Sequence, residues 1–296
     1  MTSGSVRSIE AFERAYAQAV ARKRAAQAAV LALGAACVAL AVIATEFSVW
    51  RIVEGWPRTS GFFEQAMPNL EAGKLLADVR TEGSLAFWYY RIDVWLVMLL
   101  ESAEMAVLAT ALGASAALLL AFLSAGNTSP HPVAAFAVTR LLEFLRTLPD
   151  LVIALIFVFA FGIGPMAGVL AIALHTTGAL GKLMAEVIEN IDMKPLEGLR
   201  AAGAGWSQTM RFGALPQILP NFASYAMLRF EINVAAAAAI GLVGAGGIGQ
   251  EFIQAINFGY FRDASAILLL IIGMIVAIDL VSQRIRHRLI GAEAMR

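Results

Sequence analysis

The sequence predicts an all-α integral membrane protein with six transmembrane helices. Hydrophobic residues make up 59% of its 296 residues and charged residues only 15%, against about 25% charged residues in an ordinary soluble domain. Six stretches of about 20 mostly apolar residues are each long enough to cross a bilayer as a helix. Lys plus Arg and Asp plus Glu number 22 each, so no basic surplus points to a nucleic acid partner. These observations exclude a conventional water-soluble enzyme and a disordered chain.

The predicted spans are separated by short turns or by polar loops. They lie at 25–45, 94–123, 133–161, 166–184, 222–243 and 264–281. Residues 162–165, Gly-Ile-Gly-Pro, join the third and fourth spans and are typical of a turn. No Asp, Glu, Lys or Arg occurs from 151 to 181, so these two spans are expected to form an apolar hairpin.

Basic residues are distributed unequally about these spans. With the N-terminus inside, the outside segments hold only six of the 22 Lys and Arg residues, and basic residues near span ends are retained on the cytoplasmic side. Four of the five tryptophans flank the outside segment 46–93, where amphipathic rings favour the headgroup layer. Both termini are therefore predicted to be cytoplasmic, including a tail at 285–296.

Residues 1–24 place apolar side chains among charged ones at helical spacing. Ile9, Phe12, Tyr16 and Val20 recur three or four residues apart, which predicts an amphipathic helix lying on the inner membrane face. The alternative is a solvated tail whose periodicity is due to chance.

The single cysteine, Cys37, lies within an apolar run. It excludes an internal disulfide framework and a thiol metal site. We expect no metal site in this chain.

The inside loop at 190–220 is about 30 residues long, which is too long for a simple connector. It begins with a short helix that contains Glu197 and ends near Gly203, which is able to take a positive φ. A second short helix then leads to Leu215 and Pro216. We expect the two helices to form a compact projection from the membrane face.

The spacing of Glu197, Gly203, Leu215 and Pro216 resembles the EAA loop of ABC-importer permeases. More of the chain carries the resemblance, in residues 162–170, 175–178, 197–201, 229–234 and 241–249. Together these stretches look like the phosphonate ABC-transporter permease family. One departure is Ala235, where that family commonly has an arginine. If the arginine touches the anion, this subunit serves a different oxyanion or pairs with a non-identical sister permease.

The resemblance implies a type I ABC importer core, similar to methionine permeases, over 94–284, in a multi-pass protein of the bacterial inner membrane. It implies three partners besides the bilayer: an ATP-binding cassette ATPase dimer, a periplasmic or lipid-anchored solute-binding protein, and a second permease copy, identical or paralogous. ATP and Mg would be bound by the ATPase, so the chain itself is expected to need no cofactor. In the loop, Glu197 would be the polar anchor, Gly203 the bend, and Leu215 with Pro216 the junction to the next span.

The implied function is ATP-driven uptake of phosphonate or a related phosphorus oxyanion. A permease of the same architecture for methionine or an osmoprotectant is one alternative, and a secondary transporter or channel is another. Gly244, Gly246 and Gly249 match a dinucleotide fingerprint, but they follow a spanning helix instead of a strand. No P-loop sequence occurs, so the chain is predicted to have no catalytic residues.

Polar and charged residues within the predicted spans are candidates for the translocation pathway, because charge within a bilayer is costly. The candidates are Arg229, Asn233, His175, Thr176, Thr177, Glu101 and Glu104. Arg229 is the leading candidate to meet an anion, and its alternative is an ion pair with a carboxylate. For His175 the alternative is an interhelical hydrogen bond. For the two glutamates it is pairing with a basic residue on a neighbouring helix. Arg140, Glu143 and Arg146 are expected to be interfacial.

Overall fold

The computed structural model describes residues 3–291, with side chains at 12, 13 and 15–286. Every regular element in that part of the chain is helical. The α-helices are α1 (Ser3–Ala44), α2 (Val49–Ala66), α3 (Leu85–Trp88), α4 (Ile92–Ser124), α5 (Pro132–Thr147), α6 (Asp150–Phe161), α7 (Pro165–Glu189), α8 (Lys194–Ala201), α9 (Trp206–Thr209), α10 (Leu215–Ile240), α11 (Ile248–Asn257) and α12 (Phe261–Gly291). The chain divides into two compact units, 1–63 and 64–296, with the boundary inside α2.

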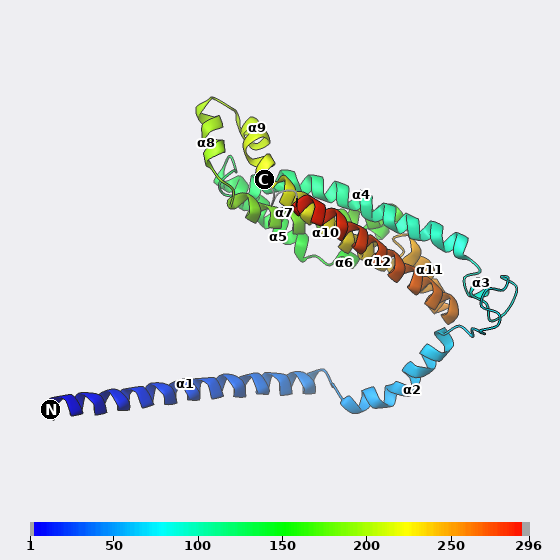
Figure 1. The fold of residues 1–296 in the computed structure, drawn as a ribbon, viewed down its shortest axis with the longest axis horizontal. Coiled ribbons are helices and arrows are strands. Elements are labelled where there is room, and N and C mark those ends of the chain that lie inside the picture. Colours follow the sequence, from blue (N-terminus) through cyan, green and yellow to red (C-terminus); the bar gives the residue numbers. More distant parts are fainter. Residues whose placement is uncertain (1–2, 292–296) are drawn as a thin grey trace. The chain divides into compact units, whose positions relative to one another are not determined.

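In the first unit, α1 is one continuous helix (Figure 1). Its apolar part, Ala15–Ala44, is long enough to cross a membrane. A surface helix at 1–24 would need a change of direction before the span, and α1 has none. Residues 19–28 contain only Ala, Val, Arg, Lys and Gln, and no glycine or proline interrupts the helix there. The helix predicted at 1–24 is therefore the first part of α1 and not a separate element. Its location on the membrane face remains a prediction, and the side chain of Ile9 lies outside the described residues.

Within the described residues, five helices are long and apolar enough to span a membrane, or up to six if one bent pair counts as a single span. The bent pair is α5 and α6, which meet at an angle of 90°. The third span was predicted as one helix over 133–161, and this is wrong at Leu148 and Pro149. A residue before proline is held away from the helical region, and Leu148 accordingly has φ −75° and ψ 126°.

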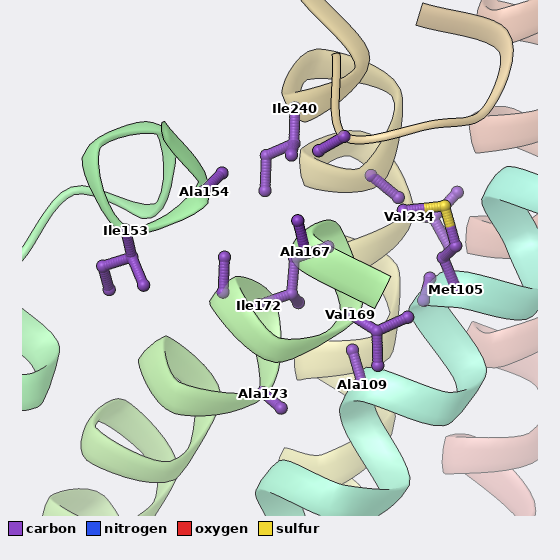
Figure 2. Packing of buried hydrophobic residues seen from close by; sticks show 14 residues of the cluster. Met105, Ala109, Ile153, Ala154, Ala167, Val169, Ile172, Ala173, Val234 and Ile240 are labelled. Carbon is purple, nitrogen blue, oxygen red and sulfur yellow. The ribbon is translucent and has the colours of Figure 1, made fainter. Parts of the chain in front are cut away.

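Small side chains hold the second unit together. A buried cluster joins α4, α6, α7 and α10, and Figure 2 shows their side chains meeting there. Alanine is its most frequent residue: eight of the 14 buried members are alanines. Van der Waals packing drives association in lipid, and small residues allow the backbones of membrane helices to approach closely. α7 therefore packs closely against its neighbours, with most of its buried residues being small.

The glycine motif at 244–249 serves the packing of α11. Gly244, Gly246 and Gly247 have φ of 82°, 87° and 72°, which favour glycine. A Cβ on Gly249 would collide with the carbonyl oxygen of Ala238 on α10. The backbone N–H of Ile248 donates to Ser102 Oγ of α4 at 2.9 Å. The motif therefore fixes α11 against α4 and α10, as its helical context predicted.

One end of this unit is fastened by polar contacts near α3, at the opposite end from α8 and α9 (Figure 1). Arg91 pairs with Glu251 of α11 at 2.6 Å, and Tyr90 Oη donates to Asp263 of α12 at 3.0 Å. Burial, followed by the charge of Asp263, raises the pKa of the Tyr90 phenol, so it remains a donor at neutral pH. These contacts tie the start of α4 to α11 and α12.

The predicted tail at 285–296 begins as a continuation of α12, and residues 292–296 lie outside the described part. Arg286 belongs to the bundle, because it pairs with Glu231 of α10 at 2.9 Å. The cytoplasmic location of both termini remains a prediction.

Candidate functional site

The predicted projection is present in the loop between α7 and α10. Helices α8 and α9 stand at one end of the bundle of the second unit (Figure 1). Gly203, between them, has φ 86°, and nothing within 4 Å would meet a Cβ there. The glycine is therefore required by the backbone turn, and the bend lies where the sequence placed it.

One face of α8 is buried and the other is open. Leu196 has 0% exposure and packs in a cluster with Met210 and Ile218. Gly213 admits this contact, since a Cβ there would lie 3.1–3.2 Å from the Leu196 and Leu199 side chains. Glu197 is exposed on the opposite face. The glycine at position 213 thus has a packing role in the loop.

The projection is pinned to the membrane helices at two points. The indole Nε1 of Trp206 donates to the carbonyl oxygen of Thr128, in the turn between α4 and α5, at 2.7 Å. The Gln217 side chain accepts from the N–H of Asp192 at 3.0 Å and donates to its carbonyl oxygen at 3.1 Å. These contacts connect the loop to α10 and to the α4–α5 turn.

The junction to α10 contains a π-helical turn, Met210–Ala214. Pro216 is the second residue of α10 and has no N–H to donate to the preceding π-helical turn. Leu215 is half-buried against the same cluster as Leu196. π-Turns interrupt helices mostly at functional positions, and here the turn lies between the projection and a spanning helix.

Three of the pathway candidates lie in a buried polar network. The amide Nδ2 of Asn233 donates to the hydroxyls of Thr110 at 2.8 Å and Thr176 at 3.0 Å. Thr177 Oγ1 donates to the carbonyl oxygen of Ala173 at 2.8 Å. Asn233 is 2% exposed and Thr176 0%. This network joins α4, α7 and α10, an arrangement that favours a structural role for Asn233, Thr176 and Thr177.

Arg229 and His175 lie together at a cavity of about 350 Å³ on the surface of the second unit. His175 Nδ1 is 3.2 Å from the carbonyl oxygen of Leu148 and 3.5 Å from Asp150 Oδ1. Arg229 has no ion-pair partner within 4.0 Å among residues with described side chains. Glu231, two residues further on, faces α12 and pairs with Arg286.

The two glutamates of α4, Glu101 and Glu104, remain candidates for the translocation pathway. Glu101 is half-buried, Glu104 is exposed, and neither forms an ion pair in the part of the chain with described side chains. Neighbouring Ser102 and Met105 face the interior. The alternative, pairing with a basic residue of a neighbouring helix, is not seen among the described side chains.

Sequence reasoning missed four residues that the structure brings to these sites. Arg146, expected to be interfacial, and Lys182 line the same cavity as Arg229. Trp206 and Gln217 pin the projection. The charge of Lys182 inside an apolar segment was a signal, but the partners of the other three lie more than 20 residues away and leave no local pattern.

No group of three His, Cys, Asp or Glu residues suited to a metal occurs among the described residues.

Residues 96–290 match the family described as binding-protein-dependent transport system inner membrane component. The phosphite transport system permease protein PtxC of Stutzerimonas stutzeri is 42% identical over 65% of this chain and 70% of its own length. A putative cryptic phosphonate transport system permease protein, PhnE2 of Escherichia coli, is 44% identical over 41% of this chain and 99% of its own.

The fold is also that of a solved importer. An inward-facing structure of the MetNI methionine ABC transporter superposes with a TM-score of 0.57 at 20% identity, over 67% of this chain and 97% of that one. At that identity the likeness concerns the fold alone, and it agrees with the type I importer core that the motifs predicted. The chain is therefore a multi-pass inner membrane permease that belongs to the binding-protein-dependent transport system inner membrane component family, and within it to the phosphonate ABC-transporter permeases that its motifs resemble.

Proposed function

We propose that this chain is the membrane-spanning subunit of an ATP-driven importer of phosphonate, phosphite or a related phosphorus oxyanion. The observation that carries the proposal is the α8–α9 projection, which exposes Glu197 and is pinned to the bundle behind it. A loop that only connected two spans would not need a buried base and two anchoring contacts. The substrate class is supported by the relatives named for phosphite and phosphonate.

Uptake of such an anion must be driven. Moving one negative charge inward against an inside-negative potential costs about 2.3 kcal/mol per 100 mV, so a passive pore would exclude a dianion. A separate ATPase dimer would supply the energy by closing on the exposed face of α8. ATP and Mg would be bound there, and this chain would need no cofactor of its own.

The proposed coupling follows the contacts of the loop. Closure of the ATPase would push on Glu197, the buried Leu196 face would pass the push to Met210, and Gln217 would carry it into α10. A second permease copy would complete the pathway, and a solute-binding protein would deliver the anion on the outer side, with 46–93 as its contact. Leu215 and Pro216 would keep α10 in line with the loop.

The test uses the purified complex of permease, ATPase and binding protein. Glu197→Ala and Gly203→Val are compared with Glu13→Ala, which removes an exposed carboxylate from α1, outside the loop and outside 46–93. We expect both loop variants to lose ATPase co-purification or ATP-dependent uptake of labelled phosphite and methylphosphonate, and the control to retain both. Normal uptake in the loop variants would remove the coupling assignment, and uptake without ATP would favour a secondary transporter.

A further inference from the structure

The cavity beside Arg229 is lined from three helices. Its lining residues include Arg146 and Thr147 of α5, His175, Lys182 and Glu186 of α7, and Arg229 of α10. Its volume of about 350 Å³ falls in the range of roughly 300–1,000 Å³ that is common for small-molecule sites. It differs from a typical apolar pocket because three of its side chains are cationic.

The cavity opens on the surface of the second unit, and two of its lining residues, His175 and Arg229, lie far from the loop ends of their helices. Arg229 follows the start of α10 by 14 residues, and His175 precedes the end of α7 by the same number. Both are therefore about 21 Å from the helix ends that carry the loop, at about 1.5 Å per residue. A bilayer core is about 30 Å thick, so these side chains lie well within membrane depth.

The break in the third span explains how α5 contributes to the cavity. α5 ends at Thr147, so Arg146 lies at the end of a half-helix instead of in the middle of a span. Gly178 of α7 allows the close approach, because a Cβ there would lie 2.5 Å from the backbone nitrogen of Arg146. Discontinuous helices that end near the bilayer midplane are a common way to build substrate sites in transporters.

The charges at the cavity are unbalanced. Lys182 Nζ is 3.8 Å from Glu186 Oε1, and that carboxylate is 63% exposed. Arg146, like Arg229, has no carboxylate within 4.0 Å among residues with described side chains. Asp150, 3.5 Å from His175 Nδ1, acts on Arg229, and with Glu186 it leaves one cation in excess. Because unbalanced charge at membrane depth is expensive, the arrangement favours an anion.

We propose that this cavity is a transit site at which Arg146, Lys182 and Arg229 hold the phosphorus oxyanion on its way through the permease. The proposal rests on the proposed function and adds two residues, Arg146 and Lys182, to the pathway. Three cations from three different helices match a tetrahedral anion, whose oxygens point in different directions. Guanidinium groups bind such oxyanions with charge-assisted hydrogen bonds.

The arrangement also provides for release. Glu186 lies one helical turn from Lys182 toward the end of α7 that carries the loop, and competes for the Lys182 ammonium group. Transport requires a site that binds well enough to be entered and weakly enough to be left. The Glu186 carboxylate therefore weakens the binding of the anion at the loop end of the cavity, where the anion would leave.

The test replaces each cation in the assembled complex. Arg146→Gln, Lys182→Gln and Arg229→Gln are reconstituted in proteoliposomes, and uptake of labelled methylphosphonate and phosphite is measured. Arg140→Gln is the matched control, since Arg140 lies on the same helix α5 and already pairs with Glu143. Loss of one charge-assisted hydrogen bond predicts a fall in uptake of roughly tenfold to a hundredfold, with partial recovery in Arg146→Lys and no change in the control.

Two outcomes would overturn the proposal while leaving the proposed function intact. One is normal uptake in all three variants when the wild-type complex transports the anion. The other is loss of permease–permease assembly in the variants, measured by mass photometry, which would make the cations partners of carboxylates on the second copy. Failure of the proposed function itself is distinct, because then the wild-type complex transports no phosphorus oxyanion.

Discussion

The network around Asn233 allows a test that separates a structural role from a transport role. Asn233→Leu keeps a side chain of similar size but removes its hydrogen bonds to the hydroxyls of Thr110 and Thr176. Side-chain hydrogen bonds between membrane helices are worth about 0.6 kcal/mol on average and about 1.7 kcal/mol at most. Two lost partners therefore predict a decrease of about 1–3 kcal/mol in the free energy of unfolding.

Thermal unfolding of the purified complex in detergent measures this loss. A change of 1 kcal/mol lowers the melting temperature by about 2–4 °C in a domain of 150–250 residues, so we expect a fall of roughly 2–12 °C. Asn221→Leu is the control, because Asn221 is exposed on the same helix. Its melting temperature should match that of the wild type.

Uptake kinetics decide between the two roles. If the network is structural, the fraction of Asn233→Leu that remains folded transports with an unchanged KM. A direct contact with the solute would instead raise KM while leaving the melting temperature unchanged. That result would refute the reasoning and return Asn233 to the pathway.

Two further predictions concern packing and anchoring. Gly178→Ala forces a methyl group against the backbone of α5 and should cost about 1–3 kcal/mol of stability, measured by thermal unfolding, whereas Gly273→Ala meets no atom within 4 Å and should be neutral. Equal melting temperatures for the two variants would contradict the close approach. Trp206→Phe removes the hydrogen bond to the α4–α5 turn and should speed hydrogen exchange of residues 125–131 while leaving exchange in α12 unchanged; unaltered exchange in the turn would contradict the anchoring role.

The spans were predictable because lipid imposes a simple rule. A segment must be apolar for about 20 residues, and five of the six predicted segments contain or overlap a helix of spanning length. The exception, 133–161, passes the same hydropathy test, but its bend depends on backbone geometry at Leu148 and Pro149. Prolines occur within membrane helices without breaking them, so Pro149 alone did not predict a turn of 90°.

The coupling loop was predictable from spacing, since its glycine and proline positions reflect local backbone requirements. Gly203 takes the positive φ expected of a bend. The contacts that pin the loop were not predictable in the same way. Trp206 meets a residue 78 positions away in the sequence, and no periodicity within the loop indicates such a partner.

The cavity could be predicted from the sequence only in part. The sequence identified Arg229 as a charge at membrane depth, but Arg146 was expected to be interfacial although an unbroken span over 133–161 would place it near the middle. Once α5 stops at Thr147, Arg146 reaches the same level as His175. The site stayed hidden because its three cations come from three different helices, and no pattern within one segment shows that they meet.

Movement of the coupling loop should change the distance between α7 and α10 more at the cavity than at the Asn233 network. Asn233 lies one turn beyond Arg229 on α10, and α10 starts at the coupling loop. If the network acts as a pivot, a push on α8 tilts α10 and changes its distance from α7 at the cavity, while the opposite ends of the helices stay close. Spin labels at Leu183 and Leu228, on the loop side of the network, should change their distance distribution when ATP is added to the complex. Labels at Met166 and Leu242, on the other side, should not; an equal change in both pairs would rule out the pivot.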